Sequence, residues 1–530
     1  MNVRNVFFAG VFLFCTTAVC FGQVKRVSVN PSKTFQVIDN FAASDAWSGN
    51  FVGKYWNDTA RQQIAEWLFS TEYDATGSPK GIGLSLWRVN VGAGTFEQAD
   101  ADIMPLQRRA ESFLTVDGKG YDWGKCLGQQ YFMEQAVKFG CNNFLLFSNS
   151  PLVQYTLNGK GWSSHSDAAN IQPDSYDKYA AYLTDVASYY QGKGWNISYI
   201  SPINEPQVDW TSPRQEGSPW KKSEMKKMYI ALDKALSGEK ELSNVKILIG
   251  EAASLKYLYE PNSYLRKRFG GEEAPDEQVK AFFDVNSPYY IGNLKHLPRL
   301  IAGHTYHNHT KNKELREVRS NAGKVFEQYD VDFHQTEWCI LNYAPPMDGF
   351  ETDWQKDDKK DIQVGLLIGR LIYSDMVDAN AKAWGYWKGM ELNGDYALIS
   401  LLAKEGNIFN GGTVSSNKIL WALGNYSFFI RPGYTRIETE GANDLDTLVA
   451  TAYLAPDHSC IVVVFVNSGY DQEEIELELP KAYNQKVKTT TVYRTDDRIE
   501  LARVYHTNKR NPTLSITPRS LTTVVLELNP

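Results

Sequence analysis

The chain has 530 residues and a formal net charge of −7, so it has no excess of positive charge with which to bind nucleic acid. It is longer than one hydrophobic core usually organises, and we expect a large domain and a smaller one. Aromatic residues make up 13% of the sequence, which suits either a large core or a site that stacks on flat apolar surfaces.

The first residues have the layout of a secretory signal peptide. Arg4 supplies a positive charge before an apolar run, and Gly22 is a small residue at a plausible cleavage point. We therefore expect residues 1–22 to be removed from a secreted or periplasmic protein. The run is too short to span a membrane, and no later segment has the pattern of a spanning helix. An alternative is lipid anchoring at the outer surface through Cys20, although Val19 is bulkier than lipoprotein processing usually accepts.

The next segment, residues 23–36, has the pattern of a strand, and we expect it to join a C-terminal β domain. From residue 37 to residue 430, short apolar runs alternate with longer helical patterns. Eight of these runs have the composition of strands and end in polar or small residues. They are residues 35–44, 82–90, 142–150, 197–206, 245–253, 300–307, 332–338 and 381–388.

The segments between these runs carry apolar residues at three- and four-residue spacing, as helices packed against a sheet require. The clearest are residues 175–194, 222–236, 312–329 and 359–380. Alternating strands and helices predict a parallel sheet. Eight such units in one domain predict a (β/α)8 TIM barrel over residues 37–430.

After residue 430 the pattern changes to short alternating strands separated by turn residues. The runs DTLVATAYLA, SCIVVVFVNS, EEIELELP, KVKTTTVYR and LTTVVLELN follow one another, and no long helical pattern separates them. This spacing is typical of an antiparallel β-sandwich. We therefore predict a side domain over residues 431–530.

Polar residues at the strand ends carry the functional prediction, because a barrel builds its active site at the C-terminal ends of its strands. Glu205 ends the fourth run and Glu337 ends the seventh, and these strands face one another across the barrel mouth. One carboxyl group can protonate a leaving oxygen while the other attacks an anomeric carbon, so the pair predicts glycoside hydrolysis. Arg88, at the end of the second run, is the expected ion-pair partner that keeps Glu337 charged. Glu251 and Trp387 also stand at strand ends, with no role assigned.

With Asn-Glu after the fourth strand and Thr-Glu-Trp after the seventh, the sequence resembles clan A glycoside hydrolases. More narrowly, it resembles glycoside hydrolase family 30, whose barrel carries a side β-sandwich completed by an N-terminal strand. The resemblance covers the mature chain and includes the passage ALGNYSFFIRPGY from barrel to sandwich. It implies that Glu205 is the acid/base, that Glu337 is the nucleophile, and that Asn204 binds the sugar 2-hydroxyl.

Within that family, the segments FAASDAWSGNF, LWRVNVGAGTFEQAD, LLFSNSPLVQYTLNGKG and AWGYWK resemble the endo-β-1,6-galactanase branch. One departure concerns the substrate subsites: Leu152 and Val153 follow Ser-Asn-Ser-Pro, where the branch tends to have an aromatic residue. The resemblance implies a retaining enzyme that cleaves β-1,6-galactan side chains of arabinogalactan. The alternatives are β-1,6-glucan, glucuronoxylan, exo-action, and a surface glycan-binding protein without catalysis.

Further residues at the strand ends are expected to line a polysaccharide or oligosaccharide site. Tyr306 is expected to bond Glu337, and the rings of Trp338 and Trp384 either stack on sugar or pack in the core. The complete set is Asp45, Trp47, Arg88, Asn90, Asn149, Asn204, His304, Tyr306, Trp338 and Trp384.

No metal or cofactor is expected. His304, His307 and His309 are close in sequence, but a strand that ends in a loop does not make them converge on one ion. Four cysteines scattered along the mature chain make neither a disulfide framework nor a CxxC zinc motif. We expect buried free thiols at Cys126, Cys141, Cys339 and Cys460, with a bridge between the first two as the alternative in an oxidising compartment.

Overall fold

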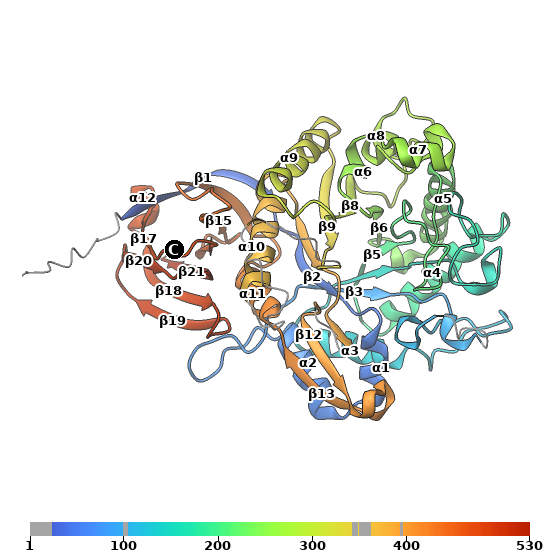
Figure 1. Cartoon of the computed structure of the whole chain (residues 1–530), viewed down its shortest axis with the longest axis horizontal. Coiled ribbons are helices and arrows are strands. Elements are labelled where there is room, and N and C mark those ends of the chain that lie inside the picture. Colours follow the sequence, from blue (N-terminus) through green and yellow to red (C-terminus); the bar gives the residue numbers. More distant parts are fainter. Residues whose placement is uncertain (1–23, 99–103, 342–347, 349–361, 393–395, 530) are drawn as a thin grey trace, which may run out of the picture.

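The computed structural model describes residues 24–98, 104–341, 348, 362–392 and 396–529. The predicted signal peptide, including Cys20, lies outside the described residues. The described chain forms a barrel wrapped by helices and, beside it, a domain built from strands (Figure 1).

The barrel is one parallel sheet whose nine segments follow the order β6-β5-β4-β3-β2-β10-β9-β8-β7. The bounds are β2 (Asn40–Ser44), β3 (Leu86–Asn90), β4 (Phe144–Phe147), β5 (Ile197–Ser201), β6 (Lys246–Ile247), β7 (Ile249–Ala252), β8 (Leu300–His304), β9 (Asp332–Glu337) and β10 (Ala383–Tyr386). β6 and β7 are two parts of the fifth strand, and they pair with β5 and β8 respectively. Each of the eight predicted runs therefore contains a barrel strand, and the predicted (β/α)8 barrel is confirmed.

The first barrel strand begins later than its sequence pattern predicted. Residues 35–37 belong instead to β1 (Lys25–Val37), which lies in the second domain between β14 and β17. Ile38 and Asp39 then carry the chain across: the first donates its N–H to the carbonyl of Tyr434, and the second to the carbonyl of Lys382. The apolar run is continuous in sequence, but its two halves pair in different sheets.

Helices cover the outside of the barrel (Figure 1). They are α1 (Ser48–Tyr55), α2 (Asp58–Phe69), α3 (Leu127–Lys138), α4 (Tyr176–Gly192), α5 (Lys222–Gly238), α6 (Lys256–Tyr259), α7 (Ser263–Phe269), α8 (Gln278–Phe283), α9 (Asn312–Gln328), α10 (Ile362–Val377) and α11 (Lys418–Ser427). In α9 the buried residues Leu315, Val318, Ala322 and Phe326 recur at helical spacing. The four predicted helices correspond to α4, α5, α9 and α10.

A small sheet that the sequence patterns did not indicate follows the eighth barrel strand. It contains β11 (Met390–Leu392), β12 (Ile399–Ala403) and β13 (Gly412–Ser416) in that order. The loop between β12 and β13 carries Phe409, whose ring meets the rings of Phe51 and Tyr55 at centroid distances of 5.7 and 5.0 Å. These contacts hold the small sheet against α1.

The second domain is a mostly antiparallel sheet with the order β19-β18-β21-β16-β15-β14-β1-β17-β20. Its other elements are β14 (Thr435–Glu440), β15 (Leu448–Leu454), β16 (Cys460–Asn467), β17 (Glu473–Glu478), α12 (Lys481–Asn484), β18 (Val487–Thr495), β19 (Ala502–Thr507), β20 (Leu514–Ile516) and β21 (Ser520–Leu528). Ile516, near one end of this order, shares a core cluster with Val492, near the other. The sheet therefore folds over itself as the predicted sandwich.

The two domains meet through α10 and α11. At Gly369, in α10, an added Cβ atom would lie 2.8 Å from the side chain of Val466 in β16. In α11, Asn425 accepts a hydrogen bond from the Thr523 hydroxyl of β21, at 2.7 Å from its carbonyl oxygen. The same helices cover the barrel and one face of the sandwich, so the two cores are separated by a single helical layer.

The four cysteines among the described residues are free thiols. Cys126, Cys141 and Cys339 are buried and Cys460 is half-buried, and none is bridged to another. The predicted free thiols are confirmed, and the alternative bridge between Cys126 and Cys141 is wrong. Burial raises the pKa of the Cys141 thiol to about 12, which keeps it protonated and unreactive near neutral pH.

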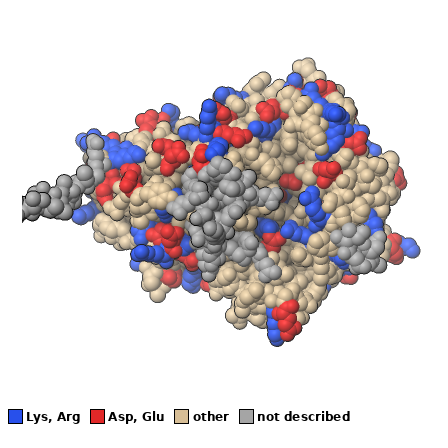
Figure 2. Space-filling view, in the orientation of Figure 1, with Lys and Arg blue, Asp and Glu red and all other residues tan. Residues whose placement is uncertain are grey.

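The surface of the described residues has two plain features. No described helix combines the length and the apolar character needed to cross a bilayer. On the face shown in Figure 2, Lys and Arg side chains are interspersed with Asp and Glu side chains. The described part of this face therefore carries both signs of charge intermixed.

The contact between α1 and α3 generates a stability test. A Cβ atom at Gly128 would lie 1.8 Å from the carbonyl oxygen of Asn50, so the two backbones touch. We expect Gly128→Ala to lower the free energy of unfolding by about 1–3 kcal/mol, because backbone atoms have to move apart. The matched control is Gly192→Ala at the end of α4, where no atom lies within 4 Å of the added carbon. Chemical denaturation of both variants measures the difference, and equal stability would contradict the contact.

Candidate active site

A bulge in β9 directs Glu337 into the barrel mouth. Gly303 of β8 is opposite Gln335, but His304, the next residue, is opposite Glu337, so β9 contains one extra residue, Thr336. An extra residue lets two neighbouring side chains point to the same side of a strand. Accordingly, the Thr336 hydroxyl reaches Glu251 at 2.6 Å inside the mouth, and Glu337 lies beside it.

A second irregularity directs Glu251 inward. Between Ile249 and Ala252, β7 has one residue more than the matching part of β8. Gly250 and Glu251 both have positive φ, at 100° and 45°. A Cβ atom at Gly250 would lie 2.4 Å from the carbonyl oxygen of Ala302, so the turn requires glycine. Its consequence is that Glu251 is fully buried below the mouth.

The backbone of Glu205 is fixed on both sides. Its φ is 44°, which is uncommon for a residue with a side chain and costs free energy unless the surroundings impose it. Its N–H donates to the carbonyl of Glu251 at 2.9 Å. The indole N–H of Trp210 donates to its carbonyl oxygen at 3.1 Å. These bonds hold the Glu205 side chain towards the mouth, where 14% of it is exposed.

The two glutamates predicted from the sequence come together at this point. A carboxylate oxygen of Glu205, a ring nitrogen of His304 and a carboxylate oxygen of Glu337 all lie within 4.8 Å of one another. The side chain of Glu337 is 5% exposed. A partly exposed carboxyl group and a buried one therefore face each other across one small volume.

Arg88 and Tyr306 bind Glu337. Arg88 donates from Nη1 to Oε2 at 2.7 Å, and the Tyr306 hydroxyl donates to Oε1 at 3.0 Å. These two contacts confirm the hydrogen-bond partners predicted for Glu337. The other guanidinium nitrogen of Arg88 donates to Oδ1 of Asn204 at 3.2 Å, so one arginine fixes the nucleophile candidate and the amide next to Glu205.

Burial and neighbouring charges together shift the pKa values of Glu337 and His304. Burial raises the pKa of the Glu337 carboxyl, whereas His304 and Arg88 act against that shift. Burial alone would lower the pKa of His304, but Glu337, Glu205 and Glu251 together raise it to about 10. The imidazole therefore carries both protons near neutral pH. It donates from Nδ1 to Glu205 and from Nε2 to Glu251, each at 2.9 Å.

The three histidines of HTYHNH do not converge. His304 lies between the carboxylates, His307 is exposed, and His309 packs against Trp338 with ring centroids 5.4 Å apart. Glu205, His304 and Glu337 are close enough to surround one ion. In this structure both ring nitrogens of His304 are instead engaged by carboxylates, Nδ1 by Glu205 and Nε2 by Glu251.

Asp45, Asn90 and Asn149 are buried at the ends of the first three barrel strands. Asp45 is 1% exposed and accepts the Asn90 backbone N–H at 2.8 Å and the Gln129 side-chain amide at 2.7 Å. Burial raises the pKa of Asp45 to about 7. The Asn149 amide is 3.4 Å from Oδ1 of Asn90. Both oxygens of Asp45 are therefore engaged within the protein, and the residue supports the end of β3.

The aromatic residues divide into two groups. Trp384 is fully buried and donates its indole N–H to Asp375 of α10 at 2.9 Å, outside the barrel wall. Its neighbours Ala383 and Gly385 line the barrel interior, and alternation along a strand therefore points Trp384 outwards. Trp338 is also fully buried. For both residues, the core-packing alternative fits their position better than sugar stacking.

Trp387 lies beside Arg88 of the site, and Trp47 packs against Trp387. Their rings meet edge to face at 5.3 Å, and the Arg88 guanidinium lies 5.6 Å from the Trp387 ring centroid. The sequence placed Trp387 and Glu251 at strand ends without predicting their roles. A glycine inside the fifth strand pattern, Gly250, was the available signal of a bulge.

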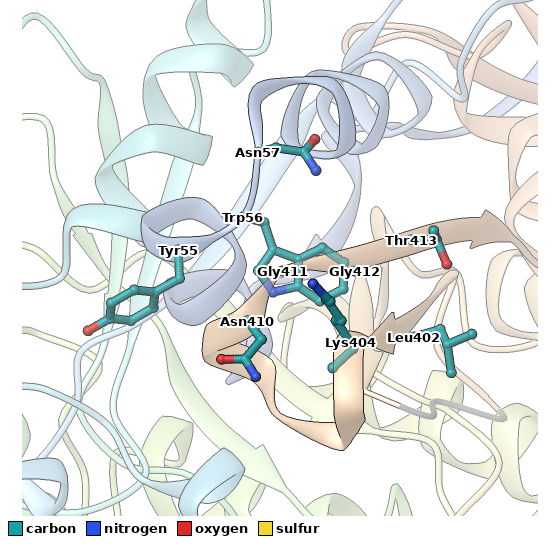
Figure 3. Close-up of a pocket in the computed structure, with 10 residues that line it drawn as sticks. Tyr55, Trp56, Asn57, Leu402, Lys404, Asn410, Gly411, Gly412 and Thr413 are labelled. Atoms are coloured by element: carbon teal, nitrogen blue, oxygen red, sulfur yellow. The ribbon is translucent and has the colours of Figure 1, made fainter.

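A groove of about 630 Å³ lies away from these carboxylates (Figure 3). It lies between the turn that joins α1 to α2 and the hairpin of β12 and β13, and Trp56 and Lys404 stand near its middle. Its lining residues are Tyr55, Trp56, Asn57, Leu402, Ala403, Lys404, Asn410, Gly411, Gly412 and Thr413. No carboxylate is among them, so this groove offers no acid or nucleophile for hydrolysis.

A (β/α)8 barrel that brings two glutamates together at the ends of its fourth and seventh strands has the fold and the site of a glycoside hydrolase. The family model for O-glycosyl hydrolase family 30 matches residues 24–397. The chain belongs to that family.

Three known proteins are similar to this chain. An endo-β-1,6-galactanase of Hypocrea rufa is 25% identical over 209 residues, which span 36% of this chain and 42% of the galactanase. The crystal structure of a conserved exported protein from Bacteroides fragilis is 32% identical, with a TM-score of 0.86, over 95% of this chain and 100% of that chain. The catalytic domain of the family 30 xylanase C of Talaromyces cellulolyticus is 20% identical, with a TM-score of 0.64, over 95% of this chain and 100% of that domain. The last likeness shows the shared fold.

The raised pKa of His304 predicts how stability changes with pH. A group whose pKa rises on folding, here from 6.5 to about 10, stabilises the folded state fully below its unfolded pKa and stops doing so above its folded pKa. We expect the unfolding free energy of wild type to exceed that of His304→Gln by the largest amount at pH 6. This difference in unfolding free energy should narrow by several kcal/mol towards pH 10, at about 1.4 kcal/mol per pKa unit. Urea denaturation at each pH measures it, and a gap independent of pH would contradict the cationic histidine.

Proposed function

We propose that the protein is a retaining endo-β-1,6-galactanase in which Glu205 is the acid/base and Glu337 is the nucleophile. The observation that carries the proposal is the close approach of the two carboxylates, within 4.8 Å. Inverting glycosidases need about 6.5–9.5 Å between their carboxyl groups to admit a water molecule, whereas retaining enzymes need about 5 Å.

The contacts supply each part of a double displacement. In the first step a Glu337 oxygen forms a bond to the anomeric carbon while the bond to the leaving oxygen breaks and Glu205 gives that oxygen its proton. Arg88 and Tyr306 hold the Glu337 carboxylate in place for attack. In the second step Glu205 takes a proton from water, the water oxygen bonds to the anomeric carbon, and Glu337 leaves.

Asn204 is placed for the sugar 2-hydroxyl. Its Oδ1 accepts a hydrogen bond from Arg88, which fixes the orientation of the amide. Among the described residues its Nδ2 has no hydrogen-bond acceptor, and it can donate to a substrate hydroxyl next to the anomeric carbon. Such a bond favours the reaction to the extent that it strengthens in the transition state.

The choice of galactan rests on two supports. One is the likeness of the strand-end segments to the galactanase branch, and the other is the 25% identity to the Hypocrea rufa enzyme over 209 residues. The same family contains a xylanase, so glucuronoxylan stays an alternative, as do β-1,6-glucan and exo-action. Export is proposed from the N-terminal pattern and from the exported Bacteroides fragilis relative.

A non-catalytic glycan-binding protein is the less favoured alternative. Both carboxylates are present, and Glu337 has its arginine and tyrosine partners at hydrogen-bond distance. A protein that only bound glycans would have no need for this buried charge arrangement, which costs free energy to assemble.

Replacement of Glu337 tests the nucleophile. We expect Glu337→Gln to reduce turnover by at least about 10⁴-fold, because the amide cannot form the glycosyl-enzyme bond. Asp209→Asn, which changes an exposed carboxylate beyond Glu205, is the control and should keep near wild-type activity. Reducing-end assays measure turnover, and thermal denaturation checks folding. Substantial activity in a folded Glu337→Gln variant would remove the assignment.

A polysaccharide panel tests substrate and stereochemistry together. We expect hydrolysis of β-1,6-galactan with release of oligosaccharides, and little release from β-1,6-glucan or glucuronoxylan. NMR of the first products should show the β-anomer, because two displacements restore the starting configuration. Preference for another glycan would replace the substrate, whereas an α-anomer would overturn the retaining mechanism.

A further inference from the structure

Glu251 is a third glutamate in the mouth, and the double displacement gives it no chemical step. It is fully buried, below Glu205 and Glu337. Its Oε2 takes all of its side-chain contacts, whereas Oε1 has none among the described residues. A buried carboxylate that neither attacks nor protonates the substrate requires another explanation, because burying it costs free energy.

The contacts of Glu251 lead to His304. Its Oε2 accepts from His304 Nε2 at 2.9 Å and from the Thr336 hydroxyl at 2.6 Å, and the Arg88 guanidinium is at 3.5 Å. Burial alone would raise the pKa of Glu251, but Arg88, His304 and Thr336 lower it to about 2. The group therefore stays charged at every pH at which an enzyme of this kind operates.

We propose that Glu251 is a positioning residue: its permanent negative charge holds His304 in the form with two N–H groups, and His304 in turn fixes Glu205 beside Glu337. This inference rests on the proposed double displacement. A neutral histidine has one N–H and donates to one partner, so it cannot donate to Glu205 and Glu251 at once.

The charges around His304 support this role. Glu205 faces it from the segment after β5, Glu251 from β7 and Glu337 from β9, and the Tyr306 ring lies 5.7 Å away. Arg88 of β3 binds Glu251 and Glu337. In the proposed first step Glu205 acts as the acid and counts as neutral, so the cations Arg88 and His304 balance the charges of Glu251 and Glu337. In the glycosyl-enzyme Glu337 is an ester and Glu205 is charged, and the balance is again zero. Without Glu251 both states would carry one uncompensated positive charge.

The test is the pH dependence of Glu251→Gln, which keeps the shape of the side chain and removes its charge. We expect the alkaline limb of its kcat/KM profile to move down by at least about one pH unit, because His304 loses its proton more easily. Glu251→Asp keeps the charge and should restore most of the wild-type profile. The substrate is whichever glycan wild type cleaves fastest.

NMR of the imidazole groups gives a readout independent of activity. The His304 signal is assigned by its loss in His304→Gln, and it should remain that of a cation at pH 8.5 in wild type and titrate at least about one pH unit lower in Glu251→Gln. If His304 has the same pKa in folded Glu251→Gln as in wild type, the inference is overturned. If Glu251→Gln fails to fold, Thr336→Val is the second test, because it removes one hydrogen-bond donor to Glu251. The pKa of His304 should then lie higher than in wild type. An unchanged His304 pKa would count against the positioning role of Glu251. Wild type that cleaves no glycan would refute the proposed function, while the titration still decides the role of Glu251.

Discussion

Arg88 lies at the bottom of the barrel mouth, and the arrangement of the site depends on its charge. Its guanidinium touches Glu337, Asn204 and Glu251, and it is 1% exposed. A buried cation of this kind is tolerated only when carboxylates compensate it at close range. With His304 as the second cation, it permits three glutamates to share a volume from which mutual repulsion would otherwise exclude them.

The backbone supports this charge arrangement by departing from regular strand geometry. Glu205 and Glu251 have positive φ, and β9 carries a bulge before Glu337. Each departure costs free energy, and the surrounding structure holds it in place. The N–H of Glu205 bonds to the carbonyl of Glu251, so the two unusual residues stabilise each other. The carboxylates are thus aimed by the scaffold before any substrate arrives.

The helical layer between the two domains explains why an aromatic residue at a strand end lies outside the mouth. Asp375 of α10 accepts hydrogen bonds from Trp384 at 2.9 Å and from Arg319 of α9 at 2.6 Å. Trp384 therefore ties the eighth strand to its helices, and Trp387, three residues later, turns towards Arg88. A strand-end position alone does not tell these two roles apart.

The sequence by itself determined the eight strand patterns, the long helices, the alternating strands of the second domain and the pair Glu205 and Glu337, because these follow from periodicity and local residue types. Only the tertiary structure decided the direction of each side chain. The bulge at Thr336 has no mark in DFHQTEW, and regular alternation would have sent Thr336 and Glu337 to opposite faces. The role of Glu251 was equally hidden, since its effect on His304 depends on charges from β3, the segment after β5, β7 and β9 that are brought together only when the barrel closes.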